Sequence, residues 1–421
     1  IAIETTGAGT CIDDIATLIE PSVKVKHEWP GKQSSMAVQA AFWPPVPAPA
    51  PGHPTSHRER ALHEAETKLA RENARSLDRI LARTPGASTD PGHPLRIGFF
   101  VNWDDASMSS LKENLAELDL LIPEWLHLAG EDGTIREDNA ERAEQVTQYV
   151  RERRPNLQIM PLVNNWNGQE WEGDKLGRML AKPAARTLAI EQLVAYAERH
   201  GFAGISIDFE DIPAKAQADF RRFVAELYGA LQPKGLRLSV NLPASDPAFK
   251  YKELAKHADY VILMAYDEHW STGAAGPIAS LPWFAKVLHE RQRDVPAEKM
   301  IVALGSYGYD WVKGSHHAEE MTFEEAVLTA KESEGDIRLD PVSLNPGFEY
   351  ADDEDQVHQV WLLDAVTVFN EMVVARSVQP RGYALWRLGG EDPSLWRVFG
   401  TQGPLDAAQA AELGDIRFAY G

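Results

Sequence analysis

The sequence predicts an α/β fold, a closed (β/α)8 barrel with a small late insertion and an N-terminal helical extension. Short apolar segments recur from residue 95 to about 400, and amphipathic helical segments separate them. This alternation is typical of a parallel sheet, and a count of eight strands favours a closed TIM barrel. The expected strands are 95–103, 120–128, 157–164, 201–211, 236–242, 259–267, 300–307 and 382–388, and the expected helices are 109–118, 139–153, 184–200, 216–231 and 281–291.

The connection between the seventh and eighth strands is longer than the others. It covers about residues 308–381 and contains two strand-like segments, 348–350 and 357–361, and a helical segment at 364–375. Crossovers in such barrels are usually short. We therefore expect an inserted subdomain or strand pair that forms one wall of a cleft.

Residues 1–94 form an arm with a different composition, and residues 401–421 form a C-terminal tail. A proline-rich linker at 43–51 precedes a helical pattern at 57–82, and a second linker follows it. Such an arm could tether the barrel to a membrane anchor or to a further catalytic domain. Because the chain starts at Ile1 without Met, we expect a removed leader and an extracytoplasmic location, whether periplasmic, secreted or membrane-anchored.

Composition restricts the partners. The formal net charge of −21 over 421 residues argues against nucleic acid and against an anionic membrane surface. The single cysteine, Cys11, excludes an internal disulfide framework and a cysteine-based metal site. His269 has no partner at metal-ligand spacing, so no metal and no cofactor are expected.

The fourth strand carries two acids on one face. Side chains alternate along a strand, so the odd-numbered residues of 204–210 face the outer helices and the even-numbered ones face the interior. Asp208 and Glu210 would then lie at the carboxyl end of the strand, where barrel enzymes place their active sites. The alternative is that an acidic pair marks a strand end entering a solvated loop.

The other strand ends carry aromatic, amide and acidic side chains. Sugar rings stack on aromatic faces, and their hydroxyls need polar partners, so this composition favours a carbohydrate site. The expected substrate-binding residues are Asn102, Trp103, Asn164, Asn241, Met264, Asp267, Trp270, Tyr309 and Trp386.

Five segments resemble motifs of family 18 glycoside hydrolases, the chitinase-like barrels. ISIDFE at 205–210 is similar to the family's fourth-strand signature, and MAYD at 264–267 is similar to its sixth-strand motif. The segments 267–270, 308–311 and 386–389 are closer to the branch of spore lysins and polysaccharide-processing enzymes. The resemblance covers about residues 95 to 400 and leaves the arm uncovered.

The resemblance implies a mechanism. Glu210 would be the general acid, and the substrate's own 2-acetamido carbonyl would attack the anomeric carbon. Asp208 would orient the acetamido N–H, Tyr266 would hydrogen-bond its oxygen, and Trp386 would form the floor of the subsite. The bland alternatives are that Trp386 is core and Tyr266 fills the barrel.

The strand departs from the family pattern, which has acids at the positions of Ala203 and Ser206 as well. The acid missing at Ser206 would share a proton with Asp208. Without it, we expect Asp208 to stay ionised.

The function expected is a retaining, endo-acting glycosidase on an N-acetylglucosamine-containing polysaccharide, such as peptidoglycan of the cell wall, chitin or an exopolysaccharide. The alternatives are a transglycosylase on a related glycan and a catalytically silent carbohydrate-binding protein. The presence of both Asp208 and Glu210 favours an enzyme, because a binding site has no need of a proton donor.

Overall fold

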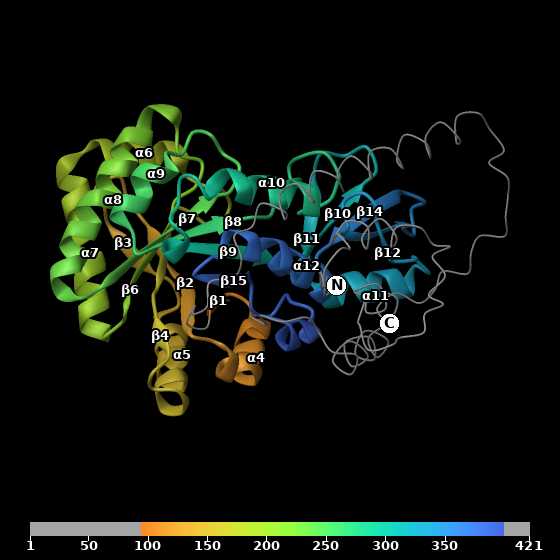
Figure 1. The fold of residues 1–421 in the computed structure, drawn as a ribbon, viewed down its shortest axis with the longest axis horizontal. Coiled ribbons are helices and arrows are strands. Elements are labelled where there is room, and N and C mark those ends of the chain that lie inside the picture. Colours follow the sequence, from red (N-terminus) through yellow and green to blue (C-terminus); the bar gives the residue numbers. More distant parts are fainter. Residues whose placement is uncertain (1–93, 400–421) are drawn as a thin grey trace.

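A closed parallel barrel forms the larger part of the chain. The computed structural model describes residues 94–399 (Figure 1). Pairing runs from β1 around the sheet to β15, and β1 pairs in parallel with both β2 and β15, which closes the ring. The predicted (β/α)8 barrel is therefore confirmed. Its strands are β1 (Leu95–Val101), β2 (Leu120–Leu128), β4 (Gln158–Ile159) with β5 (Leu162–Asn164), β6 (Gly204–Asp208), β7 (Arg237–Pro243), β8 (Tyr260–Met264), β9 (Met300–Gly305) and β15 (Gly382–Trp386).

The third barrel position is divided into β4 and β5. Met160 and Pro161 separate the two pieces, and proline has no N–H to donate to a ladder. The carbonyls still pair with the next strand, because the N–H of Ser206 donates to the Pro161 oxygen at 2.9 Å and that of Ala203 to the Ile159 oxygen at 2.8 Å. The division therefore leaves the barrel closed on the side of β6.

The fourth strand has the predicted alternation of faces. Ile205, Ile207 and Phe209 belong to the large apolar core between the barrel and its helices. A separate core fills the barrel interior and includes Phe99 and Ile122. The interior face of β6 is therefore left to small and acidic residues.

Helices cover the outside of the barrel (Figure 1). A short antiparallel strand, β3 (Ile135–Glu137), extends the sheet beside β2. The helices around the barrel are α4 (Asp105–Asn114), α5 (Ala140–Arg153), α6 (Gly173–Ala181), α7 (Pro183–His200), α8 (Gln217–Leu231), α9 (Tyr251–Leu254), α10 (Leu281–Arg291) and α12 (Ala365–Ala375), with 3-10 turns at Leu115–Glu117, Ala214–Ala216, Gln232–Lys234, Ala255–His257, Ala297–Lys299, Arg376–Val378 and Pro393–Arg397.

Local chemistry sets the ends of these helices. Pro183 opens α7, where its missing N–H costs nothing, and Gly201 closes it at φ 61°, a conformation that favours glycine. Helix α4 begins four residues before the predicted start at 109. The reason is Asp104, whose carboxylate accepts from the Ala106 N–H at 2.8 Å and caps the helix.

The insertion is a five-stranded antiparallel sheet, larger than a strand pair. Its order is β11-β10-β14-β13-β12, and it lies beside the barrel in Figure 1. Helix α11 (Phe323–Glu332) packs on this sheet through Phe323, Ala326 and Val327. The strands are β10 (Gly308–Val312), β11 (Ala318–Met321), β12 (Arg338–Leu339), β13 (Pro346–Ala351) and β14 (Val357–Leu362).

The helical segment expected within the insertion belongs to the barrel instead. Helix α12 contacts α10 and β9, and Val368, Phe369 and Met372 lie in the core between barrel and helices. It therefore completes the helical layer before β15. The helix predicted at 57–82, the rest of the predicted arm up to residue 93, and the predicted tail at 401–421 lie outside the described residues.

Candidate active site

The two acids of the fourth strand lie at the mouth of the barrel. Asp208 ends β6 and is buried, and Glu210 follows it and is partly exposed. Burial raises the pKa of Asp208 to about 7. Burial, together with the charges of Asp208, Asp267 and Asp211, raises the pKa of Glu210 well above its usual value. A carboxyl held protonated in this way can donate a proton near neutral pH.

Asn165 holds the backbone of Glu210. Its side-chain nitrogen donates to the Glu210 carbonyl at 3.0 Å, and its side-chain oxygen accepts from the Glu210 N–H at 2.8 Å. Asn165 itself is buried. The two bonds restrict both peptide groups of Glu210, so they orient the acid from the neighbouring strand. The sequence predicted a site role for Asn164, and this role of its neighbour Asn165 was not expected.

Asp267 is fixed by two tyrosines. The hydroxyl of Tyr307 donates to its Oδ1 at 2.6 Å and that of Tyr309 at 3.2 Å. Burial raises the pKa of Asp267 to about 6, and the two hydrogen bonds oppose that rise. The residue follows β8 in a left-handed backbone conformation, with φ 59°. Because Oδ1 is occupied, Asp267 is a poorer nucleophile than a free carboxylate.

Tyr266 and Trp386 lie over the barrel interior. Both pack on the interior core and on a second aromatic cluster that includes Tyr307 and Trp311. Trp386 meets Phe99 edge to face at 5.4 Å between ring centroids. Burial and the nearby acids raise the pKa of Tyr266 well above its usual value, so its hydroxyl remains a donor. Both rings are partly exposed, unlike core side chains.

Ser206 and Asn241 lie beside Asp208 in the interior. The Ser206 hydroxyl donates to the side-chain oxygen of Asn241 at 3.3 Å, and both residues are buried. This bond leaves the amide N–H groups of Asn241 for Asp208, and that hydrogen bonding opposes the rise in the pKa of Asp208. Asn241 therefore hydrogen-bonds Asp208, and its side chain is too buried to offer a large surface to a sugar.

Glu124 is an acid of the site that sequence analysis missed. It is buried within β2 and accepts a hydrogen bond from the side-chain nitrogen of Asn164 at 3.1 Å. Burial, followed by the charge of Asp208, raises the pKa of Glu124 to about 7. The available signal was a lone acid within an otherwise apolar strand, since buried acids are rare without a function or partner.

Two expectations need correction here. Asn164 is fully buried and bonded to Glu124 and, at 2.7 Å, to the Nδ1 of His127, so it is not free to bind a sugar. The expectation that Asp208 stays ionised assumed no acid behind it. Burial raises the pKa of Asp208 to about 7, and a second buried acid, Glu124, lies on β2 with its pKa also raised to about 7.

The remaining predicted residues lie around the rim. Asn102 is buried and donates to the Asp138 carbonyl at 2.7 Å, so it holds a loop. Trp103 is 60% exposed and Trp270 is 49% exposed. The Arg387 guanidinium lies over the Trp103 ring at 4.4 Å from its centroid. Met264 is partly exposed at the end of β8.

The insertion contributes to the electrostatics of the mouth. The charge of Glu320 in β11 contributes to the raised pKa values of Glu124, Asp267 and Tyr309. The positive charge of Arg387 opposes the rise in the pKa of Glu320 itself, which burial causes. The N–H of Ala318 in the edge strand β11 donates to the Ser271 carbonyl, in the loop after β8, at 2.7 Å, so this strand lies against a loop of the barrel mouth. That the insertion forms one wall of a cleft stays a prediction. Among residues 94–399, no group of three His, Cys, Asp or Glu side chains is placed to hold a metal ion.

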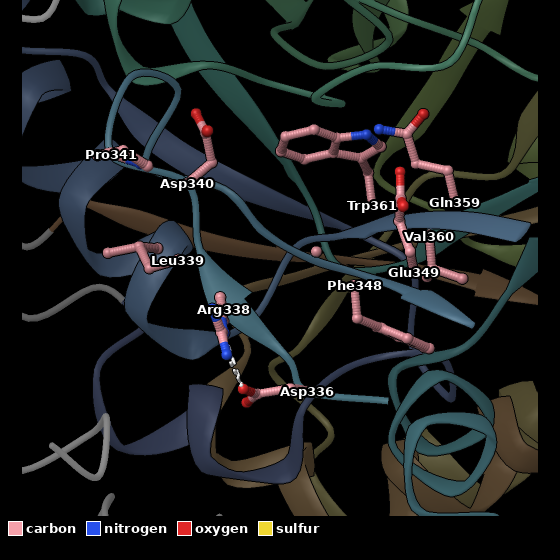
Figure 2. A pocket seen from close by; sticks show the side chains of 11 residues that line it. Asp336, Arg338, Leu339, Asp340, Pro341, Phe348, Glu349, Gln359, Val360 and Trp361 are labelled. Atoms are coloured by element: carbon pink, nitrogen blue, oxygen red, sulfur yellow. Dashed lines mark hydrogen bonds and ion pairs between the residues drawn. The ribbon is translucent and has the colours of Figure 1, made fainter. Parts of the chain in front are cut away.

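A cavity of about 470 Å³ lies on the sheet of the insertion (Figure 2). Trp361 and Gln359 lie on one side of it, and Arg338 donates to Asp336 at 2.7 Å on the other. Its lining contains none of the acids at the barrel mouth.

Within the described part of the chain, no helix is both long and apolar enough to cross a membrane.

Comparison with known proteins agrees with this geometry. Residues 96–391 match the family model described as glycosyl hydrolases family 18. The chain is 27% identical over 254 residues to YvbX of Bacillus subtilis, described as an uncharacterized glycosylase, covering 58% of this chain and 74% of that one. It is 25% identical over 261 residues to the cortical fragment-lytic enzyme of the same organism, covering 59% of this chain and 60% of that enzyme.

A chitinase from Chromobacterium violaceum has a similar fold. The TM-score is 0.67 at 22% identity, covering 76% of this chain and 98% of that one. The family match includes β1 to β15 and the acids of β6, which are the parts that build the barrel mouth. The chain therefore belongs to family 18 of the glycosyl hydrolases and is a glycosidase.

Proposed function

We propose that the chain is a retaining, endo-acting glycosidase that cleaves a glycan containing N-acetylglucosamine with the help of the substrate's own acetamido group. The observation that carries this proposal is a partly exposed acid, Glu210, whose backbone is held by Asn165 and whose pKa is raised well above its usual value, with Asp208 and Tyr266 beside it. Glu210 donates its proton to the leaving glycosidic oxygen.

The placement of the carboxyls supports a substrate nucleophile. Asp208 ends β6 and Glu210 follows two residues later, so we expect both carboxyls on one face and about 7 Å apart, since each residue advances an extended chain by about 3.3 Å. Two carboxyls on one side of a sugar do not flank its glycosidic bond from opposite faces. Asp267, the next acid, is bonded by two tyrosines. The acetamido carbonyl then fills the nucleophile's role.

Asp208 and Tyr266 would position that group. Asp208 accepts from the acetamido N–H and stabilises the positive charge that develops on the ring formed. The protonated hydroxyl of Tyr266 donates to the acetamido oxygen. Trp386 offers a partly exposed indole over the interior core, a suitable surface for a sugar ring.

The relatives favour a cell-wall glycan as substrate. Three matched proteins are named cortical fragment-lytic enzymes, and one similar solved structure is titled a spore cortex-lytic enzyme. We therefore place peptidoglycan ahead of chitin and exopolysaccharide, and this substrate requires an extracytoplasmic enzyme. The arm before the barrel would tether the enzyme near the wall.

The test compares Glu210→Gln with wild type on N-acetylated and on fully deacetylated oligosaccharides. We expect turnover of the acetylated substrate to fall by about a thousandfold or more while binding persists, because glutamine has no acidic proton to donate to the leaving oxygen. Glu170→Gln, an exposed change in the loop after β5, is the matched control and should keep activity.

Other outcomes separate the alternatives. Wild type that binds the glycan without turnover would identify a carbohydrate-binding protein, and accumulation of longer products would identify a transglycosylase. Release of product from the deacetylated polymer would contradict the acetamido mechanism. Nuclear magnetic resonance of the first product should show the β-anomer.

A further inference from the structure

Asp208 has no acidic neighbour on its own strand. The residue below it on the interior face is Ser206, whose hydroxyl donates to Asn241. Within the described chain, no group donates a hydrogen bond to the buried Oδ1 of Asp208. A buried carboxylate oxygen without a donor is costly, and a proton on the carboxyl relieves that cost.

Glu124 reaches the same space from β2. Leu120 and Ile122 belong to the interior core, so the alternation of the strand also directs Glu124 inward. Only β5 lies between β2 and β6, which separates their backbones by about 10 Å before the curvature of the barrel is counted. The two side chains point into the same interior, and the charge of Asp208 is the largest contribution after burial to the raised pKa of Glu124.

Asn164 connects the two acids. It stands opposite Asp208 in the register of β5 and β6, and it donates to Glu124 at 3.1 Å. Its own oxygen is occupied by His127. Asn164 therefore binds one oxygen of Glu124 and leaves the other free to face Asp208.

We propose that Glu124 and Asp208 share a single proton, so that Glu124 supplies from another strand the acidic partner absent at Ser206. This inference rests on the proposed role of Asp208. When the acetamido group binds, the proton leaves the Asp208 carboxyl and resides on Glu124. Asp208 then carries the negative charge that faces the acetamido N–H. The proton returns when the product leaves, so none is gained or lost.

The surroundings of the pair agree with one proton. Burial raises the pKa of each acid to about 7. The charged and titratable groups that face the pair are Glu210 and Tyr266 beside Asp208, Arg387 and Glu320 toward Glu124, and His127 behind Asn164. Arg387 is the cation among these groups that lowers the pKa of Glu124, but this effect is smaller than the rise in pKa caused by burial. Glu124 acts through Asp208 and is a positioning residue.

The test measures the titration of the Asp208 carboxyl in the full chain without substrate. Infrared difference spectroscopy and carboxyl NMR both report its protonation state. In wild type, the pair should titrate in two separate steps. In Glu124→Gln, Asp208 should titrate in one step, with its pKa lowered by about one unit because a neighbouring negative charge is gone. The acidic limb of kcat/KM should move down by the same amount.

Two further variants keep the test decisive. Ser206→Asp in the Glu124→Gln background should restore the two-step titration, because it returns an acid beneath Asp208. Asp208→Asn should lower the pKa of Glu124 by a similar amount, since coupling between two sites is reciprocal, and this holds even if Glu124→Gln folds poorly. Glu152→Gln, on the exposed face of α5, should change neither titration.

An unchanged titration of Asp208 in folded Glu124→Gln, or of Glu124 in Asp208→Asn, would overturn the proposal. The spectroscopic readouts need no turnover. A coupled titration in a chain that cleaves no glycan would therefore reject the proposed function alone.

Discussion

Replacing Asn165 with alanine removes both hydrogen bonds that hold the backbone of Glu210, at 3.0 and 2.8 Å. Each neutral hydrogen bond contributes about 1 kcal/mol net, so the substitution removes about 2 kcal/mol of free energy that holds Glu210 in its orientation. If all of it is expressed in the transition state, kcat/KM falls by about 30-fold. The fall should lie in kcat, because the clamp positions the acid and does not touch the substrate.

The assay is steady-state hydrolysis of an N-acetylated oligosaccharide together with thermal unfolding. Asn167→Ala is the matched control, since Asn167 caps the same loop by accepting from the N–H groups of Gln169 and Glu170. It should lose some stability and keep kcat. If Asn165→Ala folds and stays within about twofold of wild type in kcat, the clamp does not orient the acid and the reasoning fails.

Three further results are expected. Tyr307→Phe removes the 2.6 Å bond to Asp267 and should raise the pKa of Asp267 above about 6, by more than Tyr309→Phe with its 3.2 Å bond; an NMR titration measures both, and equal shifts would contradict the geometry. The pKa of Asp208 is raised on folding, so its stabilisation is present below the unfolded value and is lost as pH rises through about 7. Asp208→Asn should therefore raise Tm at about pH 8 and not at about pH 4, and an equal gain at both would refute this sign. Gly201→Ala, at φ 61°, should cost about 1 kcal/mol in denaturant unfolding, whereas Gly229→Ala within α8 should cost nothing; a neutral Gly201→Ala would show that the helix end can relax.

Much of the site could be predicted from local pattern. The alternation of small and apolar residues was sufficient to place Asp208 at the end of the fourth strand and on its interior face, because the side-chain period of a strand is a local property. The side of the strand that Glu210 faces stays a prediction. The eight strands followed from the same periodicity. The insertion was visible as a long connection, but the order of its sheet was not, since antiparallel pairing depends on contacts distant in sequence.

Neighbouring residues show where local reasoning ends. Asn164 and Asn165 are the same residue type at consecutive positions, yet one holds Glu124 and the other holds Glu210. Their roles depend on which strands flank β5 and on the register between them.

Glu124 gives the clearest case. Its sequence shows only an acid within an apolar strand, 84 positions before Asp208 by subtraction of their numbers. Parallel pairing of β5 with both β2 and β6 brings the two strands within two strand spacings, and the register and alternation turn both acids toward one interior. Periodicity along the chain thus decides which way a side chain faces. The pairing of neighbouring strands and the burial of their side chains decide which charged groups lie close together. Both are determined only in the folded barrel.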